Sequence, residues 1–172
     1  MRQNRGQYMP WTILIRDVVL MAATLVLWSI ANGWQVSHPS PVRNAAAVAA
    51  GVLFSLLWGY LLHEWGHLAG VWSARGRVQP SLSATALKLF TFLPEQNSQA
   101  QFVSLTVGGL TAVWLLAAGL LLFLPSGTPA GTAAIWVAVG GATFTTAVEG
   151  PVAWRAVRRA AGHSVKCDRR RP

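Results

Sequence analysis

The sequence predicts an all-α protein, a polytopic membrane helix bundle with about four transmembrane helices. Of its 172 residues, 53% are hydrophobic and only 11% are charged, whereas charged residues make up roughly 25% of a typical soluble domain. Nine tryptophans accompany this apolar composition. We expect residues 1–172 to form a single membrane-embedded domain, because the length leaves no room for a second sizeable core.

Four stretches are long and apolar enough to cross the hydrocarbon core, which takes roughly 20 helical residues. They cover residues 18–34, 45–72, 102–124 and 132–154. Pro39 and Pro41 separate the first two spans, and a Pro-Ser-Gly-Thr-Pro turn at 125–129 separates the last two. Residues 155–172 follow as a basic tail. The first span is expected to be retained rather than cleaved as a signal peptide, because the segment before it is long for such a signal.

The second span carries the motif His63-Glu64-Trp65-Gly66-His67. Residues four apart stack on one face of a helix, so both imidazoles can bind one metal ion. Glu64 lies beside that pair, where its carboxylate can act as the catalytic group on a water activated by the metal. A random chain of this composition would contain an HExxH motif roughly 0.002 times. Ionisable side chains inside a membrane are costly, so the motif predicts a functional site.

The connection at 78–101 is apolar on one face but too short to span. Its apolar residues are Leu82, Ala86, Leu89, Phe90 and Leu93. Two interpretations stay open for this segment. It is either an interfacial or re-entrant segment that covers the site, or a simple cytoplasmic connector.

A catalytic zinc site usually has three protein ligands, and Glu149 is the only carboxylate in the third or fourth span. His63 and Glu149 lie at nearly equal distances from the starts of two spans that run in the same direction, so their side chains reach similar depths. We therefore predict that His63, His67 and Glu149 bind Zn²⁺. Two alternatives remain: Glu149 pairs with Arg155 or Lys88, or the imidazoles form a structural pair without metal.

Other small and polar residues are expected to support the bundle. Glycines of the last three spans allow close helix approach; they are Gly59, Gly66, Gly70, Gly108, Gly109, Gly140 and Gly141. Thr143, Thr145 and Thr146 either accept hydrogen bonds from the imidazoles or bond back to their own helix. Asp17 is expected to be paired or hydrated beside Arg16 at the cytoplasmic interface.

Lysine and arginine gather before the first span, after the second span and in the tail, whereas the other connections carry only Arg43. Because cytoplasmic loops are enriched in Lys and Arg, both termini and the middle loop are expected in the cytoplasm. We therefore expect an integral, multi-pass protein of the plasma membrane, embedded in the lipid bilayer. The net charge of +9 follows this topology and forms no nucleic-acid-binding face, so no nucleic acid partner is predicted.

Between about residues 56 and 160 the chain resembles the site-2 protease family of intramembrane zinc metallopeptidases. The stretches that carry the resemblance are 63–67, 74–78, 103–110 and 148–151. In that family a Leu-Asp-Gly motif on the third core helix supplies the third zinc ligand, and Glu149 stands at the matching position. The resemblance implies a zinc-dependent endopeptidase whose substrate is a membrane-embedded or membrane-proximal protein or peptide.

The chain departs from that family at two points. The Gly-Pro-x-x-Asn of the second core helix reads Gly-Leu-Thr-Ala-Val at residues 109–113, and the Asn-Pro upstream of the third ligand is missing. An alternative is therefore a catalytically degenerate homologue that acts as a binding or regulatory protein. A metal-ion transporter is a third interpretation, and the oligomeric state stays open.

Overall fold

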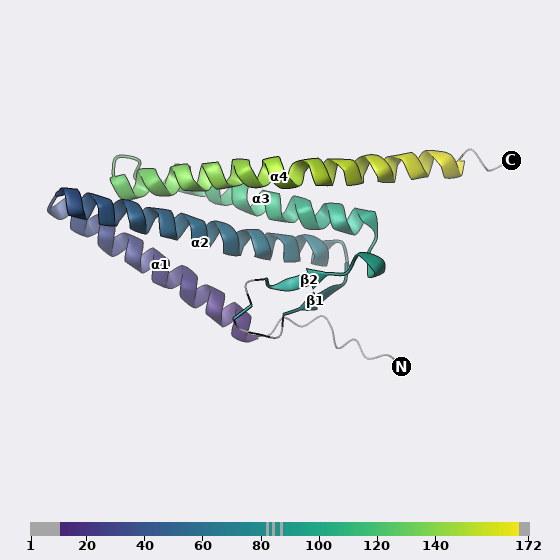
Figure 1. The fold of residues 1–172 in the computed structure, drawn as a ribbon, viewed down its shortest axis with the longest axis horizontal. Helices are drawn as coiled ribbons and strands as arrows, with labels where there is room; N and C mark the ends of the chain where they lie inside the picture. The colour runs from purple at the N-terminus through teal and green to yellow at the C-terminus, as the bar shows by residue number, and fades with distance from the viewer. Residues whose placement is uncertain (1–10, 82, 84, 87, 169–172) are drawn as a thin grey trace.

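A computed structural model describes residues 11–168 apart from 82, 84 and 87. Figure 1 shows the elements α1 (Trp11–Ser37), α2 (Pro41–Ser73), β1 (Val78–Pro80), β2 (Phe90–Phe92), η1 (Pro94–Gln96), α3 (Gln99–Phe123) and α4 (Pro129–Asp168). The four α-helices are each long and apolar enough to cross a membrane, which confirms the predicted all-α bundle. Arg2, Arg5, Leu82 and the end of the tail at 169–172 lie outside the described residues.

Local sequence signals determine where the helices start. Ser40 caps α2, since its hydroxyl accepts a hydrogen bond from the N–H three residues on. Pro41 follows in the first turn, where its missing N–H needs no partner. Helix α3 begins with a capping box, in which Ser98 and Gln101 each bond to the other's backbone N–H.

The helices extend past the apolar spans that the sequence predicts. Helix α1 begins at Trp11 rather than at residue 18, and it includes Arg16 and Asp17, which pair with each other. Helix α4 continues through Pro151 to Asp168, so the predicted tail prolongs the helix. One proline removes a single intrahelical hydrogen bond, and the Ala and Arg residues that follow favour the helical conformation.

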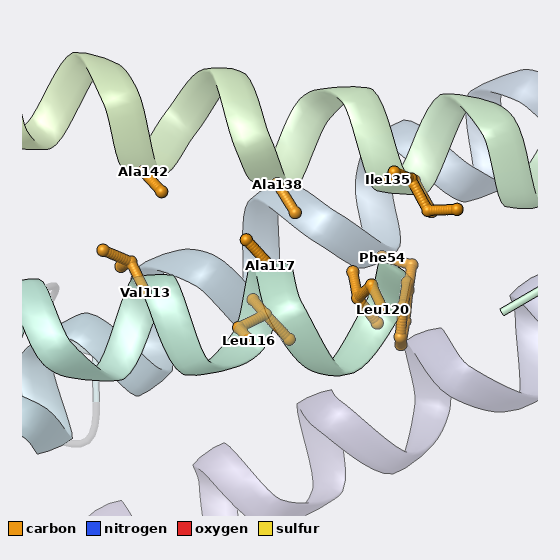
Figure 2. Close-up of a cluster of buried hydrophobic side chains, with 9 residues drawn as sticks. Phe54, Val113, Leu116, Ala117, Leu120, Ile135, Ala138 and Ala142 are labelled. Atoms are coloured by element: carbon orange, nitrogen blue, oxygen red, sulfur yellow. The ribbon is translucent and has the colours of Figure 1, made fainter. Parts of the chain in front are cut away.

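Two apolar clusters hold the bundle together. The first joins α2, α3 and α4, as Figure 2 shows, and consists of Phe54, Val113, Leu116, Ala117, Leu120, Ala134, Ile135, Ala138 and Ala142. The second joins α1, α2 and the sheet, and consists of Ile13, Leu68, Val71, Val78, Leu89 and Phe90. Residues 63–67 lie between these two clusters along α2, so packed apolar side chains flank the motif at both of its ends.

Close contact between α2 and α3 depends on glycine. A Cβ added at Gly66, Gly70 or Gly108 would overlap backbone atoms of the facing helix, which confirms the close approach predicted for this pair of helices. The same prediction is wrong for Gly140 and Gly141, since an added Cβ at either meets no atom within 4 Å. Helix α4 therefore packs through its alanines rather than its glycines.

The segment between α2 and α3 forms a short hairpin. Strands β1 and β2 pair antiparallel, with Val78 opposite Phe92. Leu89 and Phe90 pack with Leu68 in the second apolar cluster. In Figure 1 the hairpin lies at the end of the bundle where α1 begins and α4 extends beyond its neighbours. The hairpin segment thus packs against α1 and α2, and the choice between an interfacial or re-entrant segment that covers the site and a cytoplasmic connector stays a prediction.

Candidate metal centre

His63 and His67 of α2 meet Glu149 of α4. Nε2 of His63 lies 3.2 Å from Oε1 of Glu149, and Nε2 of His67 lies 3.6 Å from the same oxygen. One ligand atom from each of the three residues lies within 4.8 Å of the other two. Ligand atoms around a tetrahedral ion with bonds of 2.0–2.1 Å lie roughly 3.3 Å apart. The three side chains can therefore hold one metal ion.

The hydrogen bonding of these side chains fits a cation. The side chains of His63 and Glu149 are 15% and 28% exposed. Nε2 of His63 and Oε2 of Glu149 are buried, and neither has a hydrogen-bond partner in the described part of the chain. Buried polar atoms are nearly always bonded, so a neutral imidazole pair without metal would leave these two atoms unsatisfied. A metal ion held by the three residues would give Nε2 of His63 a partner and would lie beside Oε1 of Glu149.

Glu149 faces the two imidazoles rather than a basic side chain. Within the described residues, its ion-pair contacts are with His63 and His67. The alternative of a pair with Arg155 or Lys88 is therefore wrong. Helices α2 and α4 run in the same direction, so the predicted similar depth of His63 and Glu149 along them accounts for this meeting.

The backbone of α3 orients His67. Nδ1 of His67 lies 2.9 Å from the carbonyl oxygen of Leu105. Because a carbonyl oxygen only accepts, Nδ1 carries the proton and Nε2 of the neutral ring keeps its lone pair for a metal.

The threonines of α4 bond to their own helix. Thr143 and Thr146 each donate to the carbonyl four residues earlier, so the alternative of back-bonding holds for both.

Gly109 makes room for the ring of His67. A Cβ added at Gly109 would lie 2.6 Å from Nδ1 of that ring, which no real contact allows. The paired glycines of this span predicted helix packing, whereas the site-related role of Gly109 was missed. The signal was the glycine itself, but nothing in the sequence says which side chain it faces.

The hairpin segment reaches the motif through Glu64. The N–H of Leu89 donates a long hydrogen bond of 3.4 Å to Oε2 of Glu64. Leu89 is fully buried, which fixes the backbone that carries this N–H. The contact joins residues 25 positions apart, and no periodic pattern predicts it.

Asp17 is paired as expected, but in a buried place. Its side chain accepts a 2.8 Å hydrogen bond from Nε of Arg16 and a 2.9 Å hydrogen bond from Nε1 of Trp65. Asp17 is only 1% exposed, so it is paired rather than hydrated. Its link to Trp65, inside the HExxH motif, was not predicted.

Comparisons of this chain with protein-family models, with curated proteins and with solved structures found no match. The functional argument therefore depends on the residues of the site.

A cavity of about 220 Å³ has His63, one of the three converging residues, in its wall. It lies between α2, α3 and α4. Most of its lining is apolar, and the residues that form it include Leu56, Val113, Leu116, Val137, Ala138 and Gly141. A space of this size and character accommodates an apolar side chain beside the metal centre.

Proposed function

We propose that this protein is a zinc-dependent intramembrane endopeptidase of the site-2 protease type. The observation that carries the proposal is the meeting of one carboxylate from α4 with two imidazoles one turn apart on α2. Two histidines and one glutamate form a ligand set used by zinc peptidases. All three side chains belong to helices apolar enough to span a membrane, which supports a substrate in or next to the bilayer.

In this mechanism His63, His67 and Glu149 hold the ion. Bound zinc supplies a Lewis acid that activates water and polarises the scissile carbonyl. Glu64 accepts the proton of the attacking water on a carboxylate oxygen and passes it to the leaving amine. The N–H of Leu89 donates to that carboxylate and so helps to direct it.

The substrate we propose is a membrane-embedded or membrane-proximal peptide segment. A regular helix hides its carbonyls in intrahelical hydrogen bonds, so such a segment must unwind locally before a bond is cleaved. The largely apolar cavity beside His63 supports an apolar side chain next to the scissile bond.

The proton acceptor provides the test of this mechanism. Wild type, Glu64→Gln and the control Glu95→Gln, whose glutamate is exposed outside the spanning helices, are purified and reconstituted in liposomes. Their substrate is a single-span peptide whose apolar segment is interrupted by glycines. Glu64→Gln should cleave about a hundredfold more slowly or worse and retain zinc, while Glu95→Gln matches wild type. Undiminished cleavage by Glu64→Gln refutes the mechanism.

The departure from the family motif at residues 109–113 favours one alternative, a catalytically degenerate homologue that binds or regulates a partner. Zinc content separates the two proposals. An endopeptidase carries about one zinc ion per chain. Purified protein far below that content favours the degenerate homologue.

A further inference from the structure

We infer that Arg16 and Asp17 of α1 are positioning residues for Glu64, acting through Trp65 and through the segment that precedes β2. This inference rests on the proposed function, in which Glu64 accepts the proton. It extends that function because α1 contributes neither a metal ligand nor the proton acceptor, yet holds the group that performs the chemistry.

The first connection runs through the indole of Trp65. Nε1 of Trp65 donates to Oδ2 of Asp17, while Arg16 binds Oδ1, so each carboxylate oxygen has a donor of its own. Burial of the Asp17 carboxylate, which is only 1% exposed, costs desolvation free energy, and this cost argues for a specific role of the pair. Trp65 directly follows Glu64 in the motif, so fixing its indole fixes the turn of α2 that carries the proton acceptor.

The second connection runs through the segment before β2. Nη1 of Arg16 donates a 2.7 Å hydrogen bond to the carbonyl of Ala86. Three residues further on, the N–H of Leu89 contacts Oε2 of Glu64. The side chain of Leu89 shares the second apolar cluster with Ile13 of α1. Helix α1 therefore holds this segment through a hydrogen bond and through apolar packing.

Both connections start from neighbouring residues of α1 and end at Glu64. One fixes the backbone of the proton acceptor, and the other fixes a donor to its carboxylate. A proton acceptor must lie within hydrogen-bond distance of the proton it removes, and a misplacement of about 1 Å can slow a reaction by about a hundredfold. The loss of either connection should therefore slow the chemical step without weakening substrate binding.

The chain offers a matched control for Trp65. Nε1 of Trp58 donates a 3.1 Å hydrogen bond to the carbonyl of Met21 on α1. This contact also joins an indole of α2 to α1, but it lies about two helical turns from Trp65. Trp58→Phe thus removes the same kind of contact between the same two helices, away from Glu64.

The experiment compares wild type, Asp17→Asn, Trp65→Phe and Trp58→Phe in liposomes with the glycine-interrupted single-span peptide. Asp17→Asn keeps the size of the side chain and one acceptor oxygen, and Trp65→Phe probes the same contact from the other partner. We expect kcat to fall about ten- to a hundredfold in both, with KM and zinc content unchanged. Trp58→Phe keeps the wild-type kcat. Hydrogen–deuterium exchange of the Leu89 amide should become faster in Asp17→Asn and stay unchanged in Trp58→Phe.

Equal kcat values in Trp65→Phe and Trp58→Phe overturn the inference and leave the proposed function intact. Unchanged exchange at Leu89 in Asp17→Asn also overturns it, as does a loss of zinc that accounts for the fall in kcat. A wild-type protein that cleaves no peptide while carrying zinc overturns the proposed function together with this inference. The two failures are thus distinguishable.

Discussion

At the scale of single residues, Gly109 determines where the imidazole of His67 lies. An added Cβ would fall 2.6 Å from Nδ1, the nitrogen that binds the carbonyl of Leu105. We predict that Gly109→Ala pushes the ring from its place and lowers zinc affinity by about ten- to a hundredfold, as the loss of a ligand's supporting partner does.

Competition between the purified protein and a chromophoric zinc chelator measures this affinity. Gly140→Ala is the matched control, because an added Cβ at Gly140 meets no atom within 4 Å. Equal zinc affinity in the two alanine variants would show that Gly109 has no part in holding His67.

The ligand set could be predicted from the sequence because it depends on distances along helices. Spacing places His63 and His67 on one face, and equal depth brings Glu149 to them, as the structure shows. The supporting contacts of Leu105 and Asp17 could not be predicted in this way. They depend on how neighbouring helices are rotated about their axes, and neither helix encodes that rotation by itself.

At the scale of elements, α2, α3 and α4 leave the cavity beside His63. Gly141 of α4 lines it, and an added Cβ there meets no atom within 4 Å, so a larger side chain enters without a clash. We predict that Gly141→Leu fills the cavity and slows cleavage of the single-span peptide about tenfold or more, while zinc content is unchanged.

Initial rates over a range of peptide concentrations measure this effect. Gly140→Leu adds the same side chain at the neighbouring position, outside the lining of the cavity, and should cleave like wild type. If the two leucine variants cleave equally fast, the cavity does not accommodate the substrate.

Hydropathy is sufficient to predict that four helices exist, but not where they end. A span predicted from hydropathy ends near charged residues. Helix α1, however, includes an internal ion pair, and α4 continues across Pro151. The hairpin was not predicted, because β1 pairs with β2 across a connection of nine residues whose apolar positions show no clear alternation.

At the scale of the whole molecule, the start of α1, the hairpin and the extended end of α4 lie at one end of the bundle (Figure 1). Arg75, Arg77 and Arg155 belong to the segments at that end, while Arg43 begins α2 at the other. From the enrichment of basic residues in cytoplasmic loops, we predict that the hairpin end faces the cytoplasm.

Cysteine labelling in intact cells tests this orientation. After Cys167→Ser removes the single native cysteine, Ser126→Cys or Ser83→Cys is introduced at an exposed position of either end. A membrane-impermeant maleimide should label Ser126→Cys in intact cells and Ser83→Cys only after permeabilisation. The reverse pattern would contradict the predicted orientation.

Zinc content of the purified protein tests the central claim, that Glu149 completes a metal site with two imidazoles of α2, most directly. Wild type and the control Glu95→Ala should each carry about one zinc ion per chain, measured by mass spectrometry after dialysis against a weak chelator. Glu149→Ala, which lacks the carboxylate that lies 3.2 Å from Nε2 of His63, should lose most of its zinc under the same dialysis. Zinc retained by Glu149→Ala as fully as by wild type would contradict the account.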